Sequence, residues 1–153
     1  MMVMTAKVNL KKIAILLGAF ALLVIALAAM LNRQDQTTGA AVSDNDGRVA
    51  FLKSFGWQVT PAPVESGPVK IPAEQSEVFD RYAQLQKNQG YDLSAYAGKT
   101  VMRYVYQVTN YPGAEEPVYA TLLVHKNQII GGDVTNTSAD GKVQGFAMPS
   151  PAE

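Results

Sequence analysis

The chain has 153 residues, with 13 basic and 13 acidic side chains and no cysteine. Without cysteine it can form no disulfide, no thiolate metal site and no lipoprotein attachment site. The charges are unevenly distributed, because residues 44–153 carry nine basic and twelve acidic side chains. A mildly acidic domain lacks the basic footprint of a nucleic-acid-binding protein.

Residues 13–31 form an apolar run without a charged side chain. A helix of this length spans roughly 28 Å, close to the hydrocarbon thickness of a bilayer. Lys7, Lys11 and Lys12 precede the run, so the positive-inside rule places residues 1–12 in the cytoplasm. We therefore expect a single-pass signal anchor in the cell membrane, with the remainder of the chain outside the cytoplasm.

Two other interpretations of this run stay open. Ala26-Leu27-Ala28 has the small-x-small pattern of a cleavage site, and cleavage would release a secreted soluble domain. The apolar part of a cleaved signal usually spans only about 7–15 residues, which favours the anchor. The third interpretation is a short buried helix.

The remaining sequence divides into a flexible linker at residues 32–43, one domain at 44–148 and a disordered tail at 149–153. The linker is polar and has no apolar periodicity. In the domain, Asp44 or Asp46 is expected to cap a first helix that ends at Gly56. The apolar face of this helix is predicted to contain three residues: Val49, Leu52 and Phe55.

Four prolines, at positions 61, 63, 68 and 72, follow the first helix. Proline has no N–H for a sheet ladder, so we expect an edge strand or an extended crossing here. A second helix is predicted from Pro72 or Ala73 to Gln89, ending at Gly90. Its predicted buried stripe has four members: Val78, Phe79, Tyr82 and Leu85. Residues 91–99 are expected to form a compact linker with one helical turn.

The last third of the domain is rich in valine, tyrosine and threonine, which favours β structure. We predict strands at residues 100–111, 118–125, 128–135 and 143–148. Pro112-Gly113 suits a type II turn, and Lys126-Asn127 suits a tight hairpin. Two helices followed by an antiparallel meander of three to four strands make an α+β domain. We expect both helices to pack on one face of the sheet.

Several blocks of sequence resemble an uncharacterised bacterial family, the domain of unknown function number 4830. The matching blocks are Gly47 to Leu52, Phe55 to Trp57, Leu85 to Lys87, Gln89 to Leu93, Tyr96 to Lys99, Val108 to Gly113 and Ile130 to Val134. The resemblance implies a short, membrane-anchored protein of clostridia-like Firmicutes with an outward-facing domain. Family members often have Cys where Thr135 stands and His where Gln144 stands, so this chain could not share chemistry that needs those groups.

His125 is the only histidine, and no cysteine can join it in a metal site. A catalytic base would need a partner group that the sequence does not show. We therefore expect neither a cofactor nor a metal. The enzyme alternative is a cleft in which His125, Asp133 and tyrosine hydroxyls converge within hydrogen-bonding reach.

Six residues are candidates for a ligand or partner surface: Tyr104, Tyr106, Tyr119, Gly131, Gly132 and Asp133. If the helices cover the face that carries the tyrosines, these are core residues with hydroxyls at the rim, which is the arrangement we expect. If the helices cover the other face, an aromatic binding surface is left exposed. The glycines lack the further glycines, helix and lysine of a phosphate loop, so a bulge or close backbone crossing is expected there.

These features favour a non-catalytic extracytoplasmic domain that binds an envelope protein, a peptide or a cell-wall component. The anchor, the compact domain and the strong strands support binding, and no group of residues has catalytic spacing. The sequence does not indicate the oligomeric state.

Overall fold

The structure is a computed structural model that describes residues 40–150. The predicted cytoplasmic segment at 1–12, the predicted span at 13–31 and most of the predicted linker lie outside the described residues. Within residues 40–150, no helix is long and apolar enough to cross a membrane.

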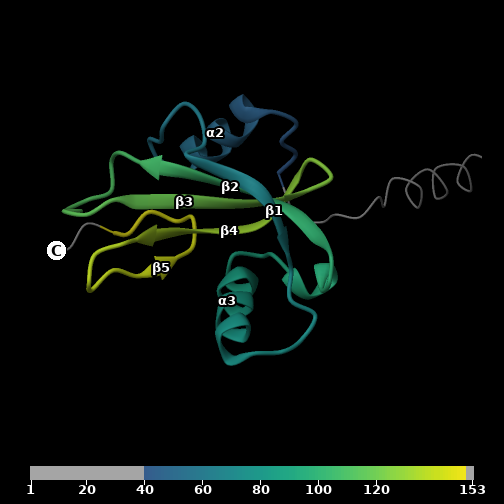
Figure 1. Cartoon of the computed structure of the whole chain (residues 1–153). Coiled ribbons are helices and arrows are strands. Elements are labelled where there is room, and N and C mark those ends of the chain that lie inside the picture. Colours follow the sequence, from purple (N-terminus) through teal and green to yellow (C-terminus); the bar gives the residue numbers. More distant parts are fainter. Residues whose placement is uncertain (1–39, 151–153) are drawn as a thin grey trace, which may run out of the picture. The chain divides into compact units, whose positions relative to one another are not determined.

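The described residues contain a five-stranded antiparallel sheet whose strands follow one another in sequence order (Figure 1). The strands are β1 (Glu65–Lys70), β2 (Thr100–Val108), β3 (Val118–His125), β4 (Gln128–Asn136) and β5 (Val143–Gln144). Two α-helices, α2 (Asn45–Ser54) and α3 (Glu77–Asn88), and a 3-10 turn, η1 (Leu93–Tyr96), complete the fold. The α+β class is confirmed, and β1 extends the predicted meander by one edge strand that contains Pro68.

The first helix forms where the sequence predicts it. The Asp44 carboxylate accepts a hydrogen bond from the Gly47 N–H at 2.8 Å and so satisfies one free donor of the first turn. The chain leaves α2 through Gly56, whose φ of 92° lies in the left-handed region that glycine tolerates.

The predicted start of the second helix is wrong by several residues. Ser76 caps α3 by accepting a hydrogen bond from the Phe79 N–H, so the helix begins at Glu77 and not at Pro72 or Ala73. Val78 therefore lies in the first turn and is 80% exposed, although we predicted it in the buried stripe. The fully buried side chain of α3 is instead Gln86.

The two helices lie on opposite faces of the sheet, so the expectation that both cover one face is wrong (Figure 1). Leu52 of α2 packs with Leu122, whereas Phe79 of α3 packs with Leu123. Neighbouring residues of a strand point to opposite faces. One face of β3 is apolar throughout and lies in the core under α2, whereas on the other face only Leu123 joins the core under α3.

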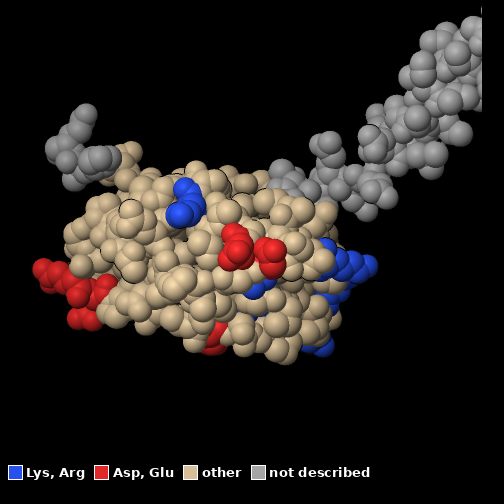
Figure 2. Space-filling view, turned by 90° about the horizontal axis from the view of Figure 1, so that it is seen from above, with Lys and Arg blue, Asp and Glu red and all other residues tan. Residues whose placement is uncertain are grey.

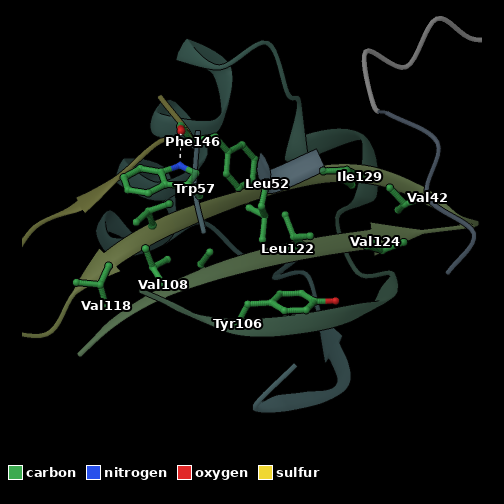
Figure 3. Packing of buried hydrophobic residues seen from close by; sticks show 12 residues of the cluster. Val42, Leu52, Trp57, Tyr106, Val108, Val118, Leu122, Val124, Ile129 and Phe146 are labelled. Atoms are coloured by element: carbon green, nitrogen blue, oxygen red, sulfur yellow. Dashed lines mark hydrogen bonds between the residues drawn. The ribbon is translucent and has the colours of Figure 1, made fainter. Parts of the chain in front are cut away.

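The larger core lies under α2 (Figure 3). Its centre is Trp57, whose indole N–H donates to the Phe146 carbonyl oxygen at 2.7 Å and so ties the C-terminal segment to the sheet. The buried members are Val42, Leu52, Trp57, Tyr106, Val108, Val118, Ala120, Leu122, Val124, Ile129, Val134 and Phe146.

The smaller core lies between the sheet and the two elements α3 and η1, which cover only part of this face of the sheet. Its buried members are Ile71, Leu93, Tyr96, Val101, Leu123 and Ile130. Its sheet residues, Val101, Leu123 and Ile130, lie at the end of the sheet where β2 begins and β3 ends. The same face beyond this cluster carries no covering helix in the described part of the chain, and this leaves room for a surface site.

Residues 40–42, which we assigned to the linker, hydrogen-bond to the sheet. The Val42 N–H donates to the Asn127 carbonyl oxygen at 2.7 Å, and the Ile129 N–H donates to the Ala40 carbonyl oxygen at 3.1 Å. Lys126 and Asn127 both have positive φ, at 48° and 62°, which confirms the tight hairpin between β3 and β4.

Candidate functional site

The part of the sheet that α3 leaves uncovered forms a shallow depression with both polar and apolar lining residues, which we call the open groove. Six residues define it: Tyr82, Arg103, Tyr119, Thr121, Asp133 and Thr135. Two adjoining hollows of about 400 and 440 Å³ share Arg103, Thr121 and Thr135 as their floor. One hollow extends toward Val64 on the β1 side, and the other lies between Phe79 of α3 and Val143 of β5.

Strand register brings the floor of the groove together. Tyr119 pairs with Thr135 and Thr121 pairs with Asp133 across β3 and β4. Directly paired residues point to the same face of a sheet, so these four side chains form a square. Arg103 stands on the adjacent strand β2, where it pairs with Leu123 of the smaller core.

Asp133 is the acidic residue of the groove whose pKa is shifted from its ordinary value. It is only 7% exposed and accepts hydrogen bonds from the Tyr82 hydroxyl at 2.9 Å and the Thr135 hydroxyl at 2.7 Å. Burial raises the pKa of the Asp133 carboxyl, and the two hydrogen bonds act in the opposite direction. The Asp133 carboxyl thus joins α3 to β4 at the inner wall of the groove.

The Tyr82 hydroxyl stays protonated throughout the physiological range. Burial is the main cause that raises its pKa, and the neighbouring Asp133 carboxylate raises it further. A protonated phenol is a permanent donor, so Tyr82 holds the carboxylate in place without a cation.

Arg103 supplies the groove with a guanidinium group. One of its nitrogens, Nη1, donates to the Glu65 carboxylate at 2.6 Å across β1 and β2. Both side chains remain substantially exposed, so this ion pair contributes little stability. A guanidinium group has five N–H donors, so it can bind Glu65 and still donate to a ligand.

Gly131 and Gly132 precede Asp133 on β4, and the Gly132 backbone is held by side chains of the α3 segment. The Gln86 side-chain amide donates to the Gly132 carbonyl oxygen and accepts from the Gly132 N–H, both at 2.9 Å. The amide therefore occupies the place that a neighbouring strand would take. A Cβ on Gly132 would lie 2.2 Å from the Thr121 carbonyl oxygen, which confirms the predicted close backbone crossing. The ladder shifts register between Leu123 and Val124, as a β-bulge does.

Gln89 extends this network toward the C-terminal segment. Its amide nitrogen donates to the Gly132 carbonyl oxygen at 3.0 Å, and its amide oxygen accepts from the Phe146 N–H at 2.7 Å. Gln86 of α3 and its C-cap residue Gln89 thus hydrogen-bond to the backbone of β4 between its contacts with residue 41 and with β5.

The predicted tyrosine set is divided between the two faces. Tyr106 is buried under α2, donates to the Asn45 amide oxygen at 3.0 Å and accepts from Arg48 Nε at 2.9 Å. Arg48 also stacks 3.8 Å above the Tyr104 ring. Tyr104 and Tyr106 therefore belong to the larger core, as expected. Tyr119 alone points into the open groove.

The enzyme alternative requires His125 and Asp133 to converge, and the structure does not bring them together. Asp133 pairs with Thr121, and His125 lies four residues further along β3, at about 13 Å for an extended strand. The His125 ring instead packs against Tyr96, with their centroids 5.3 Å apart. Residues 40–150 contain no cluster of three His, Cys, Asp or Glu side chains that could hold a metal.

Sequence reasoning missed most of the groove. Tyr82 was placed in the buried stripe of the second helix, Thr135 was singled out only as a position where family members often have Cys, and Arg103 and Thr121 were not among the candidates. The usable signal was the alternation of β3 and β4, which puts Tyr119 and Thr121 on one face with Asp133 and Thr135 opposite them. The alternation predicts a surface site only when it is known which face of the sheet the helices leave uncovered.

The family comparison gives a coarse identification. The family described as Domain of unknown function (DUF4830) matches residues 51–134, which is more than half of the chain, and the chain belongs to this family. The matched range includes α3, β2, β3 and most of the groove floor. No curated protein and no solved structure gives a significant match to the chain.

Proposed function

We propose that this family member is a membrane-anchored, extracytoplasmic binding module whose ligand lies in the open groove. The observation that carries the proposal is the half-covered sheet face: α3 and η1 shield one end of it, while Tyr119, Thr121 and Thr135 line accessible hollows. A concave surface with a few converging polar groups is the usual form of a binding site.

The composition of the groove favours an extended ligand that carries both polar and apolar groups. Two threonine hydroxyls and the Arg103 guanidinium can hydrogen-bond to amide or hydroxyl groups, and the Tyr119 ring offers a flat apolar surface with a polar end. The two hollows are shallow and continuous, so they suit a chain that lies across the strands. A segment of an envelope protein, a free peptide or a cell-wall glycan strand has this chemistry.

The apolar run at residues 13–31 and the lysines before it support the location. An anchor keeps a binding domain at high local concentration next to other envelope components, so even weak binding in the groove would be effective. The domain would then act as a tethered receptor and not as a diffusing one.

Site-specific photo-crosslinking in intact cells tests the proposal. A photoreactive amino acid replaces Tyr119 in the groove, and a matched variant carries it at Lys53, which is exposed on α2 on the opposite face. We expect one discrete crosslinked species from position 119 and none from position 53.

Filling the groove provides the control. Adding Thr121→Arg to the position 119 variant should abolish the crosslink, because the longer side chain occupies the shared floor. Equal crosslinking from positions 119 and 53, or a crosslink that survives Thr121→Arg, would contradict the groove as the binding surface.

A further inference from the structure

Several of the domain's charged side chains gather at the two ends of the sheet. Figure 2 shows a group of basic side chains at the right end and a group of acidic side chains at the left end, with further charged side chains of both signs between them. The acidic end consists of the β2–β3 loop with Glu115 and Glu116 and the β4–β5 loop with Asp140, all exposed, and the second loop also carries the exposed Lys142. The basic end contains three exposed lysines: Lys70, Lys99 and Lys126.

Strand register and side-chain contacts bring these three lysines together. Lys70 ends β1 and pairs with Thr100, the neighbour of Lys99. The Lys99 ammonium group lies 5.4 Å from the centre of the Tyr96 ring, and the same ring packs against His125. Lys126 follows His125 in the β3–β4 hairpin. We call these three lysines the basic end.

The described chain begins at the basic end. Residue 41 pairs with Gln128, and the Val42 N–H donates to Asn127, next to Lys126. Only eight residues, 32–39, separate this point from the apolar run that ends at Leu31. Eight fully extended residues span at most about 29 Å. A membrane anchor that ends at Leu31 would therefore keep the start of the described chain within about 29 Å of the bilayer surface.

We infer that the basic end docks on anionic lipid headgroups of the bilayer in which the chain is anchored. The inference rests on the anchor of the proposed function and adds a defined orientation. With Lys70, Lys99 and Lys126 on the headgroups, the acidic end points away from the membrane. This orientation is favoured because the anionic headgroups would repel the carboxylates of the acidic end. The open groove lies on a sheet face between the two ends and stays accessible from the side.

Nearby carboxylates oppose this docking in part. Asp44 and Asp46 stand at the start of α2, a few residues after the contact between Val42 and Asn127. The exposed Glu74 follows Ala73, which lies beside Gly98, and the exposed Asp92 caps η1. Asp44 is engaged as the helix cap, whereas Asp46 lies in the first turn of α2 and is exposed. Removing the Asp46 charge should strengthen docking, and removing lysine charges should weaken it.

The full chain is reconstituted in vesicles of phosphatidylcholine alone or with one-third phosphatidylglycerol, each containing a headgroup spin-labelled lipid. Because the chain has no cysteine, one fluorophore can be attached at Thr100→Cys beside the basic end or at Glu116→Cys at the acidic end. We expect phosphatidylglycerol to increase quenching at position 100 and not at position 116. High salt should reverse the increase.

Charge variants make the test specific. A lysine beside an anionic surface changes the docked-to-undocked ratio about fivefold, so Lys70→Gln, Lys99→Gln and Lys126→Gln together should lower it roughly a hundredfold. The matched triple variant, Lys53→Gln, Lys87→Gln and Lys142→Gln, removes the same charge from exposed positions elsewhere and should leave quenching unchanged. Asp46→Asn should increase quenching at position 100.

The outcomes separate the two proposals. Failure of the chain to float with the vesicles overturns the anchor, and the docking with it. A chain that floats but shows no lipid-dependent quenching at position 100, or equal loss in both triple variants, overturns the docking alone.

Discussion

At the scale of single residues, Asp133 combines burial with a position at the groove wall. The folded carboxyl has a pKa above its ordinary value of 3.8, mainly because burial disfavours the charged form. The native state therefore holds this proton to higher pH than the unfolded chain does. The contribution of Asp133 to stability is present below the unfolded pKa and is lost as pH rises through the folded pKa.

The first prediction concerns Asp133→Asn. The amide is neutral at every pH, and the Tyr82 and Thr135 hydroxyls can either donate to it or accept from it. The variant should be more stable than the wild type at neutral pH, and this advantage should shrink as pH falls toward the unfolded pKa. Thermal unfolding of the full chain in detergent as a function of pH measures the difference.

The exposed Asp140→Asn is the matched control, and we expect it to leave the pH dependence of stability unchanged. A stability difference between Asp133→Asn and wild type that is constant across pH would show that ionisation of Asp133 does not limit stability.

The second prediction concerns Gly132, where the backbone passes too close to β3 for a side chain. In Gly132→Ala the new Cβ would lie 2.2 Å from the Thr121 carbonyl oxygen and 2.5 Å from the Phe146 ring. Relief requires the backbone to move, so we expect a loss of about 3 kcal/mol of unfolding free energy. A denaturant titration measures it.

Gly67→Ala in β1 is the control, because a Cβ there would meet no atom within 4 Å. We expect a change of less than about 0.5 kcal/mol for this exposed-edge substitution. Equal stability of the two alanine variants would contradict the close crossing at Gly132.

At the scale of elements, α3 is held to the sheet by hydrogen bonds from side-chain amides as well as by apolar packing. Gln86 fills the place of a missing strand beside Gly132, and Gln89 links the same carbonyl to Phe146. The helix that forms one wall of the groove is thereby fixed to the strand that carries Asp133. Its position sets the width of the hollow between Phe79 and Val143.

The third prediction follows from this arrangement. Gln86→Met keeps the volume of the side chain but leaves the buried Gly132 N–H without its partner, which should cost about 2 kcal/mol of unfolding free energy. Gln84→Met, on the exposed side of the same helix, should cost less than about 0.5 kcal/mol. Both are measured by chemical denaturation, and similar losses in the two variants would refute the strand-like role of Gln86.

Local sequence signals predicted the elements better than their arrangement. Capping and turn residues located α2, η1 and the β3–β4 hairpin, because those structures depend on neighbouring residues. Gln86 was missed because a glutamine in a helix is ordinarily exposed, and only its distant partner Gly132 makes burial favourable. The side of the sheet that each helix covers was also predicted wrongly, because the packing of a helix on a sheet depends on residues far apart in the sequence.

The groove illustrates the same limit. Each of its strands could be predicted, and so could the alternation that places Tyr119 and Thr121 on one face. Whether that face is a core or a surface depends on how far α3 reaches across it, which is a property of the tertiary structure. Asp133 was singled out from the sequence, but its partners Tyr82 and Thr135 required the structure.

At the scale of the whole molecule, the proposed anchor, membrane docking and groove are compatible with one arrangement of the protein. In these proposals, an anchor would hold the domain outside the cytoplasm, the basic end would rest on the bilayer, and the open groove would face sideways toward other envelope components. The anchor is the premise on which the docking and the location of the binding function both depend. A cleaved signal would remove it, and the mature chain would then begin near Ala29.

Single-cysteine labelling in intact cells tests this premise most directly. Glu116→Cys lies in the domain and Thr5→Cys lies before the apolar run, and no native cysteine interferes. We predict that a membrane-impermeant maleimide labels position 116 in intact cells and position 5 only after lysis, with both proteins recovered in the membrane fraction. Labelling of position 116 only after lysis, or recovery of the domain from the medium, would contradict a membrane-anchored extracytoplasmic domain.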